Sequence, residues 1–154
     1  SRDALLRIHD NTFVELDEGV ALEGTEAYVS DNFFELNRVG LSNTNGGPSA
    51  FNNIFYDNEE VGVALHGGEA FIGMSTILGG PTHTTAAGVT CDELSISDDS
   101  LVYGTLIHDV VDGVTSGATC SATVVFSGFF DITGTEVDAG WTIDTSQPNV
   151  SGTG

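Results

Sequence analysis

Residues 61–78 read Val-Gly-Val-Ala-Leu-His-Gly-Gly-Glu-Ala-Phe-Ile-Gly-Met-Ser-Thr-Ile-Leu, and this stretch decides the fold class that the sequence predicts. It contains two short apolar runs, 61–66 and 70–78, which are separated by Gly-Gly-Glu, a turn signal. Neither run has the 3.6-residue spacing of a helix, and β-branched residues occur in both. The stretch therefore predicts short β-strands that are bounded by glycine-rich turns.

Similar runs recur on both sides of this stretch. They lie at 51–56, 94–97, 101–107, 122–130 and 141–143. Short runs spaced about 8–12 residues apart and bounded by Gly, Asn and Asp are typical of β-sandwiches and small barrels. The 20 glycines suit the turns and bulges of such a fold. We predict an all-β chain, folded as a small β-barrel or sandwich.

The first 50 residues differ from the rest. Apolar and acidic residues alternate at 11–19 and again at 32–40, whereas Leu-Ser-Asn-Thr-Asn-Gly-Gly-Pro-Ser at 41–49 is a loop signal. We therefore expect an N-terminal arm or hairpin over 1–50 and a β-rich body over 51–154 that ends in a flexible tail. Helical spacing occurs only at residues 1–9, which predicts at most a short terminal helix.

The charge balance is strongly acidic. The chain has 23 Asp and Glu against 3 Lys and Arg, all of them arginines, and its net charge is −20. Such a surface repels itself in dilute buffer, but at molar salt the Debye length falls to about 3 Å and screens the repulsion. The composition therefore predicts a protein from a halophilic source. Apolar residues make up 40% of the chain, which is typical of a folded domain rather than a disordered acidic segment.

The same charge argues against direct binding of nucleic acid or of an anionic membrane, because both need clustered Lys and Arg. No apolar stretch is long enough for a membrane span, and the N-terminus does not read as a signal peptide. We expect synthesis in the host cytoplasm, with the initiator Met removed. Cys91 and Cys120 either form one disulfide or remain two buried thiols.

Catalytic motifs are missing from the sequence. The histidines have no metal-ligand spacing, Ser75 lacks a nucleophile elbow, and no phosphate-binding glycine loop is present; the four histidines are His9, His66, His83 and His108. We predict a protein that is not an enzyme and that carries no cofactor. The acidic clusters at 92–93, 98–99 and 109–112 either bind Ca²⁺ or Mg²⁺ or form a solvated acidic face. The sequon at Asn149 lies in the predicted tail.

One pattern of glycine and apolar residues resembles a known family. It consists of Gly-Glu-Ala-Phe-Ile-Gly-Met-Ser-Thr-Ile-Leu-Gly at 68–79, Leu-Val-Tyr-Gly-Thr-Leu-Ile-His-Asp-Val at 101–110, Gly-Val-Thr-Ser-Gly-Ala at 113–118 and Ala-Thr-Val-Val-Phe-Ser-Gly-Phe-Phe-Asp at 122–131. The pattern resembles the opening strand and the closing hairpin of head decoration proteins, also called capsid cement proteins, of tailed viruses. The resemblance covers residues 61–132.

The resemblance implies a homotrimer that sits on the exterior of a virus capsid and clamps adjacent capsomers, with the major capsid protein as its partner. An arm over the first residues would add a strand to a neighbouring capsid subunit. Aromatic residues are favoured at buried contact centres, so five of them are candidates for this interface. These are Phe33, Phe34, Phe51, Phe55 and Tyr56, and the alternative is that they fill the core.

The function expected from sequence is therefore capsid decoration in a virus of a halophilic archaeon. One alternative is a jelly-roll coat, penton or spike subunit of an icosahedral haloarchaeal virus. Another is a secreted halophilic β-sandwich that binds carbohydrate. That alternative requires exposed Trp and Tyr on one face, and the chain has 1 Trp and 3 Tyr.

The acidic composition leads to a direct test. On dialysis from molar to millimolar salt, the isolated protein should lose its β-sheet signal in circular dichroism, because its self-repulsion is no longer screened. A spectrum that is the same at both salt concentrations would remove the argument for a halophilic source.

Overall fold

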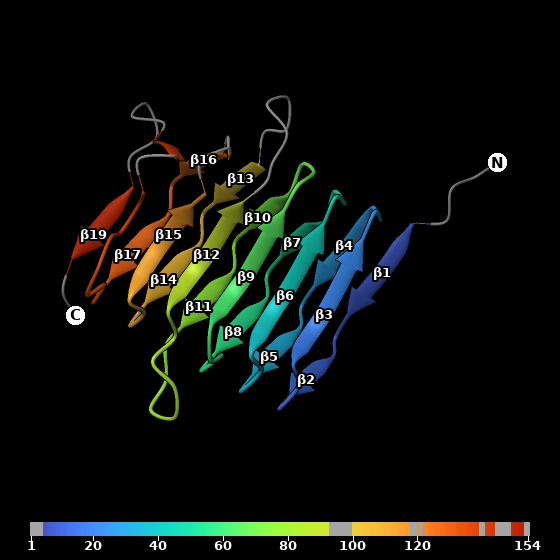
Figure 1. Cartoon of the computed structure of the whole chain (residues 1–154), viewed down its shortest axis with the longest axis horizontal. Coiled ribbons are helices and arrows are strands. Elements are labelled where there is room, and N and C mark those ends of the chain that lie inside the picture. The colour runs from blue at the N-terminus through green and yellow to red at the C-terminus, as the bar shows by residue number, and fades with distance from the viewer. Residues whose placement is uncertain are drawn as a thin grey trace.

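The structure of the chain is a computed structural model that describes residues 5–92, 100–117, 120, 122–138, 141–143 and 149–152. Over these residues the chain winds as a parallel β-solenoid of about 6 turns. In this part of the chain each of the first five turns runs through three sheets, and the turns after β15 through two of them; the sheets extend along one common axis (Figure 1). None of the described residues forms a helix that is long and apolar enough to cross a membrane.

The three sheets are named A, B and C. Sheet A contains β1 (Leu6–His9), β4 (Ala27–Ser30), β7 (Ser49–Phe51), β10 (Phe71–Gly73), β13 (Ser100–Tyr103), β16 (Ala122–Val125) and β18 (Trp141–Ile143). Sheet B contains β2 (Thr12–Val14), β5 (Phe33–Glu35), β8 (Ile54–Tyr56), β11 (Thr76–Leu78), β14 (Leu106–His108), β17 (Gly128–Phe130) and β19 (Val150–Gly152). Sheet C contains β3 (Glu18–Glu23), β6 (Val39–Thr44), β9 (Val61–His66), β12 (Ala87–Asp92) and β15 (Asp112–Ser116).

The predicted barrel or sandwich is wrong, although the all-β class is right. Every pair of these strands is parallel, and each strand pairs with the equivalent strand of the next turn rather than with its neighbour in sequence. The segment that resembles a closing hairpin contains β13 and β14, which pair in parallel with β16 and β17. A parallel pair needs a long crossover, and here the other two sides of the turn supply it.

The first 50 residues are wound into the same solenoid from β1 onward. β1 pairs with β4 in the register Leu6 to Ala27, so the helix expected over residues 1–9 is wrong for this part of it. Residues 1–4 lie outside the described residues. The predicted boundary at residue 50 falls inside β7, which pairs with β4 on one side and β10 on the other. At the other end β19 pairs with β17, where a flexible tail was predicted.

A stack of aromatic rings fills the interior behind sheet B. Phe13, Phe34 and Phe55 occupy equivalent positions in successive turns, with ring centroids 5.0 and 4.7 Å apart. The column continues through Ile77, Ile107 and Phe129. Stacked rings bury large apolar area and add offset-stacking energy, so each turn fixes the side-chain positions of the next.

A ladder of polar side chains closes the corner between sheets A and B. Asn32 accepts the backbone N–H of Asn11 at 3.0 Å, and its amide group donates to the carbonyls of Ile8 and Ser30, both at 2.9 Å. Its members are Asn11, Asn32, Asn53, Ser75, Thr105, Ser127 and Asn149. The residue before each of the first six has a positive φ; these are Asp10, Asp31, Asn52, Met74, Gly104 and Phe126. The ladder satisfies backbone groups that a sharp corner leaves unpaired.

The ladder also accounts for the sequon. The Asn149 side-chain oxygen accepts the backbone N–H of Ser127 at 2.7 Å, and its nitrogen donates to the Val124 carbonyl at 3.4 Å. A glycan on that nitrogen would disrupt the contact with Val124. The side chain is therefore part of the fold and is poorly placed to accept sugar.

A second ladder, of glycines, lines the start of sheet C. The equivalent positions are Gly19, Gly40, Gly62, Gly88 and Gly113. A Cβ added at Gly40 would lie 2.5 Å from the Gly62 carbonyl oxygen and 2.6 Å from the ring of Phe55. Both neighbours are fixed, one as backbone and the other inside the ring stack. Glycine is therefore required for the turns to approach one another here.

Replacement of Gly40 tests this packing. Gly40→Ala should lower the free energy of unfolding by about 1–3 kcal/mol, because overpacking forces the ring stack or the backbone to shift. Gly152→Ala is the matched control, since its Cβ would meet Phe130 at an ordinary 3.5 Å. Thermal or denaturant unfolding in molar salt measures both. Equal stability of the two variants would contradict the close approach.

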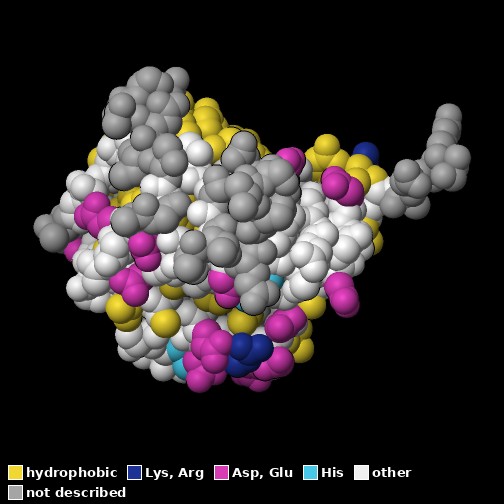
Figure 2. Space-filling view, turned by 45° about the horizontal axis from the view of Figure 1, so that its top comes forward, with side chains coloured by type: hydrophobic (Ala, Val, Ile, Leu, Met, Phe, Trp, Pro, Cys, Tyr) yellow, Lys and Arg dark blue, Asp and Glu magenta, His cyan; other side chains and the backbone are white. Residues whose placement is uncertain are grey.

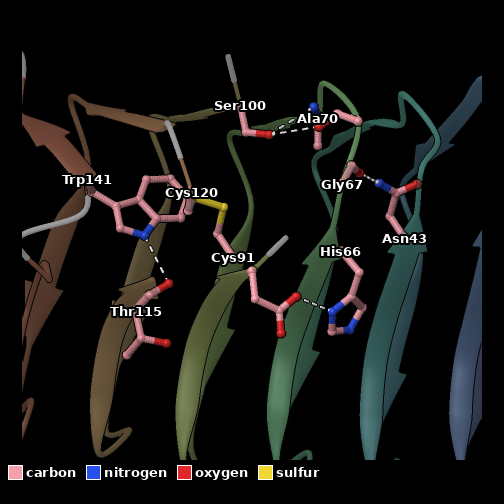
Figure 3. Close-up of a disulfide and its surroundings, with 11 residues drawn as sticks. Asn43, His66, Gly67, Ala70, Cys91, Ser100, Thr115, Cys120 and Trp141 are labelled. Carbon is pink, nitrogen blue, oxygen red and sulfur yellow. Dashed lines mark hydrogen bonds and ion pairs between the residues drawn. A yellow bond between two sulfur atoms is a disulfide. The ribbon is translucent and has the colours of Figure 1, made fainter. Parts of the chain in front are cut away.

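Of the two states considered for the cysteines, the disulfide is the one observed. Cys91 lies at the end of β12, and its Cα is 5.8 Å from that of Cys120 (Figure 3). Next to it, the indole nitrogen of Trp141 donates to the Thr115 carbonyl at 2.9 Å. The disulfide ties a strand of sheet C to the connection that leads into β16 in sheet A.

Reduction of this disulfide should destabilise the fold without abolishing it. A disulfide restricts the unfolded chain, and for a sequence separation of 29 this restriction contributes about 3 kcal/mol to the free energy of unfolding. Reduction removes that contribution. We expect a lower melting temperature in reducing buffer at constant salt. The Cys91→Ala/Cys120→Ala variant should match the reduced protein, and an unchanged melting temperature would show that the bridge contributes nothing.

Candidate functional site

The outer face of sheet A carries one aromatic side chain in each of five successive turns. We call this row the aromatic stripe: Tyr28, Phe51, Phe71, Tyr103 and Phe126. The first four belong to strands of sheet A, and the last lies at the corner that follows β16. The residues between them in these strands point inward and are fully buried, as Val29, Ile72 and Val102 are. Period-two alternation therefore places the aromatic side chains outside.

The rings of the stripe contact one another in two groups, Tyr28 with Phe51, and Tyr103 with both Phe71 and Phe126. The centroids of Tyr28 and Phe51 are 6.1 Å apart, those of Phe71 and Tyr103 6.4 Å, and those of Tyr103 and Phe126 5.6 Å. The Phe71 ring folds over Gly73, where a Cβ would lie 2.5 Å from it. Gly73 lies between Phe51 and Tyr103 in the ladder, so this ring fills the gap in the row.

A groove of about 540 Å³ lies at the N-terminal end of the stripe. Tyr28 and Phe51 line it together with Leu5, Arg7, His9, Ser30 and Asp31. The guanidinium of Arg7 lies 6.0 Å from the centroid of the Tyr28 ring, within cation–π range. The groove thus combines apolar and aromatic side chains with a guanidinium, an imidazole, a carboxylate and the hydroxyls of Tyr28 and Ser30.

Asp31 stays ionised in this groove. The hydrogen bond from the Asn52 amide, then that from Ser30, holds the pKa of the Asp31 carboxyl below its ordinary value. A carboxylate with a lowered pKa accepts hydrogen bonds and does not act as a general acid near neutral pH. The arrangement suits binding of a ligand that carries hydroxyl or amine donors.

The two described arginines differ in their engagement. Arg38 contacts Asp17 and Glu60 at 2.6 Å each, and these two carboxylates raise its pKa; Glu18 lies 3.7 Å away. Figure 2 shows a basic side chain surrounded by acidic ones in this way. For Arg7 the described contact is the aromatic one with Tyr28. The guanidinium of Arg7 is therefore accessible to a ligand in the groove.

The C-terminal end of the stripe is more apolar. At the corner between sheets A and B, Met74 is 59% exposed and Phe126 46%, and Tyr103 and Leu106 beside them are also exposed. Monomeric proteins rarely expose contiguous apolar surface of this kind unless it binds something. The stripe therefore changes from mixed polar and aromatic at one end to apolar at the other.

The five aromatic residues predicted as an interface do not lie together. Phe34 and Phe55 are fully buried in the ring stack, which is the alternative that the sequence left open for them. Phe33 and Tyr56 lie half-buried on sheet B, and only Phe51 belongs to the stripe. A capsid contact through the three outer residues stays a prediction.

The predicted acidic clusters do not gather. Asp92 pairs with His66, and Asp112 accepts the backbone N–H of Thr135 at 2.7 Å. Asp109 occupies a corner with positive φ. Over the described ranges no three His, Cys, Asp or Glu side chains are grouped as metal ligands, and Glu93, Asp98 and Asp99 lie outside those ranges.

One buried carboxylate was not foreseen from the sequence. Asp57 is 1% exposed and accepts the backbone N–H groups of His83 at 2.7 Å and of Thr82 at 3.0 Å. Burial raises the pKa of Asp57, but these hydrogen bonds outweigh it, and the net pKa is lowered. The residue anchors an insertion in the solenoid between β11 and β12. No local motif marks this role, because the partners lie more than twenty residues away.

The stripe itself had a signal in the sequence. Successive members are spaced at about the length of one turn, as the polar ladder contacts with a separation of 21 residues show. An alignment of the chain on that repeat would have placed Tyr28 level with Phe71, and Phe51 level with Tyr103, on one face of the same sheet. Comparisons of this chain with protein-family models, with curated proteins and with solved structures find no match.

Proposed function

We propose that this protein is a non-enzymatic binding module whose aromatic stripe takes an extended carbohydrate chain. The observation that carries the proposal is the presence of one outward aromatic side chain in each of five successive turns. Parallel strands are about 4.8 Å apart. Tyr28 and Phe71 align with Ser49, whereas Phe51 and Tyr103 align with Gly73, so the aromatic side chains form a staggered row along the solenoid axis. A linear polymer with a regular repeat can contact all of them at once.

The chemistry of the stripe fits sugars. One face of many sugar rings carries mostly C–H groups, and stacking that face on an aromatic ring buries apolar area. The ring hydroxyls then need partners at the side. Asp31 accepts hydrogen bonds, Arg7 donates them, and both line the groove beside Tyr28 and Phe51.

The charge of the chain favours a sugar over the other polymer that stacks on aromatic rows. Single-stranded nucleic acid also uses such rows, but its phosphates require basic side chains nearby. This chain has a net charge of −20 and offers one accessible described arginine at the stripe. Stacking and apolar burial are not weakened by salt, so they operate in the molar salt that the composition predicts.

This proposal develops the carbohydrate-binding alternative, with a solenoid in place of the predicted sandwich. The disulfide is consistent with an oxidising location outside the cell. Capsid decoration in a halophilic archaeal virus, with the major capsid protein as partner, stays a prediction from the sequence. A virion protein that binds a glycan on a cell or particle surface would be consistent with both the glycan-binding proposal and the predicted role in a virus particle.

The double variant Tyr28→Ala/Tyr103→Ala tests the proposal. Stacked aromatic pairs contribute about 0.5–1.5 kcal/mol each, so the loss of two should weaken glycan binding roughly tenfold. Affinity electrophoresis in molar salt, through gels that contain neutral β-linked and α-linked polysaccharides, measures retardation of the wild type. The control is Tyr56→Ala, which removes a half-buried tyrosine from the outer face of sheet B.

The wild type and the control should be retarded equally by at least one polysaccharide, and the double variant should need roughly tenfold more of that polysaccharide for the same retardation. If the double variant and the wild type are retarded alike, the glycan binds elsewhere. If no polysaccharide retards the wild type, the proposed function is wrong.

A further inference from the structure

The two ends of the solenoid expose open edges of sheet B. Its first strand in space is β2 and its last is β19, and among the described residues each of the two pairs on one side only. An open edge offers unpaired N–H and C=O groups as a template for another strand. Both edges consist entirely of described residues, so their hydrogen-bonding groups can be assigned.

The ladder pattern identifies which groups are free. Phe33 donates its backbone N–H to the Asn11 carbonyl, and Glu15 donates to the Glu35 carbonyl. In a parallel ladder the residues alternate between the two neighbours, so the N–H groups of Thr12 and Val14 point away from β5. By the same alternation Ser151 in β19 points its N–H group away from β17.

The two ends of the polar ladder also carry hydrogen-bonding groups that complement each other. Each inner asparagine accepts the backbone N–H of the previous turn, as Asn32 and Asn53 do. Asn11 starts the ladder, and over the described residues its side-chain oxygen accepts no hydrogen bond. Asn149 ends the ladder, and its backbone N–H has no acceptor among them. One end of the molecule thus lacks the donor that the other end presents.

We propose that a second copy of this chain stacks head to tail on the first, with β19 of one copy paired in parallel to β2 of the next. The Asn149 N–H of one copy then donates to the Asn11 side-chain oxygen of the other. Ser151, at the position that aligns with Phe129, would face the ring of Phe13 at the end of the ring stack. A small residue opposite a half-buried ring leaves room for the contact.

The charge of the chain sets the conditions for this assembly. Two copies carry −20 each, and their repulsion opposes contact in dilute buffer. At molar salt the Debye length is about 3 Å, and the short-range hydrogen bonds of the edges remain. The contact joins two different surfaces and stacks the copies along one axis, so it generates open filaments rather than closed rings. This assembly is independent of the proposed glycan binding.

Two edge variants test the proposal. Val14→Pro removes an outward N–H at the β2 end, and Ser151→Pro removes one at the β19 end. The residues before the two substituted positions, Phe13 and Val150, belong to extended strands. Proline is also tolerated in an edge strand where its missing N–H would face away from the sheet. Val14→Thr keeps the N–H and is the matched control. Sedimentation velocity in molar salt measures assembly, and circular dichroism verifies that each variant is folded.

The wild type and Val14→Thr should form polymers whose length grows with concentration, and each proline variant alone should be a monomer. A mixture of the two proline variants should form dimers in a one-to-one ratio, because each keeps the edge that the other has lost. A wild type that is monomeric in molar salt at every concentration overturns the proposal. A closed trimer that persists in both proline variants also overturns the proposal, as does a mixture of the two variants that stays monomeric. If one proline variant fails to fold, the other still tests the proposal, because its polymerisation would overturn it.

Discussion

The structure depends on one constraint, which is that each turn of the chain must hydrogen-bond in register with the next. All the described strand pairs are parallel, and each joins equivalent positions of successive turns. In-register stacking places equivalent residues in contact, so the side chain at each position must pack against its equivalents in the neighbouring turns. The Phe13–Phe34–Phe55 stack and the glycines at Gly19 and Gly40 are two results of this requirement. Where one turn places a ring inside, the neighbouring backbone must leave space for it.

The same constraint gives the outer surface its regularity. A solenoid repeats its exterior at the spacing of the strands, so a single aromatic residue per turn becomes a continuous row. The polar corner behaves similarly, because Asn32 satisfies backbone groups of two turns at once. It also means that the repeat stops at two open edges. The proposed glycan site and the proposed head-to-tail contact are both consequences of a fold built from one repeated unit.

Part of this fold could be predicted from the sequence. Runs such as 61–66 and 70–78 contain strands β9, β10 and β11, and the glycine-rich segments do separate strands. The pairing could not be read from local signals, since a short apolar run does not reveal whether its partner is its chain neighbour or lies one turn away. Val39–Thr44 shows a related error. Most of it was predicted as loop from Ser, Asn and Thr, whereas pairing with β3 and β9 makes it a strand.

The repeat itself was visible in Asn11, Asn32 and Asn53 and in the phenylalanines two residues after each. It is obscured further along, because Ser75, Thr105 and Ser127 replace asparagine and because the insertion anchored by Asp57 lengthens one turn. Of the stripe, only Phe51 was singled out from the sequence, since surface position depends on strand register. Buried partners such as Asp57 with His83 depend on a loop conformation that no spacing encodes.

Interstrand nuclear Overhauser effects in the isotopically labelled protein, recorded in molar salt, test the in-register stacking most directly. The account predicts contacts between Val29 and Ala50, between Ala50 and Ile72, and between Ile72 and Val102, in the pattern of parallel strands. Close Hα–Hα contacts between residues of β13 and β14, or of β16 and β17, are the mark of antiparallel hairpins. Their observation would contradict the solenoid.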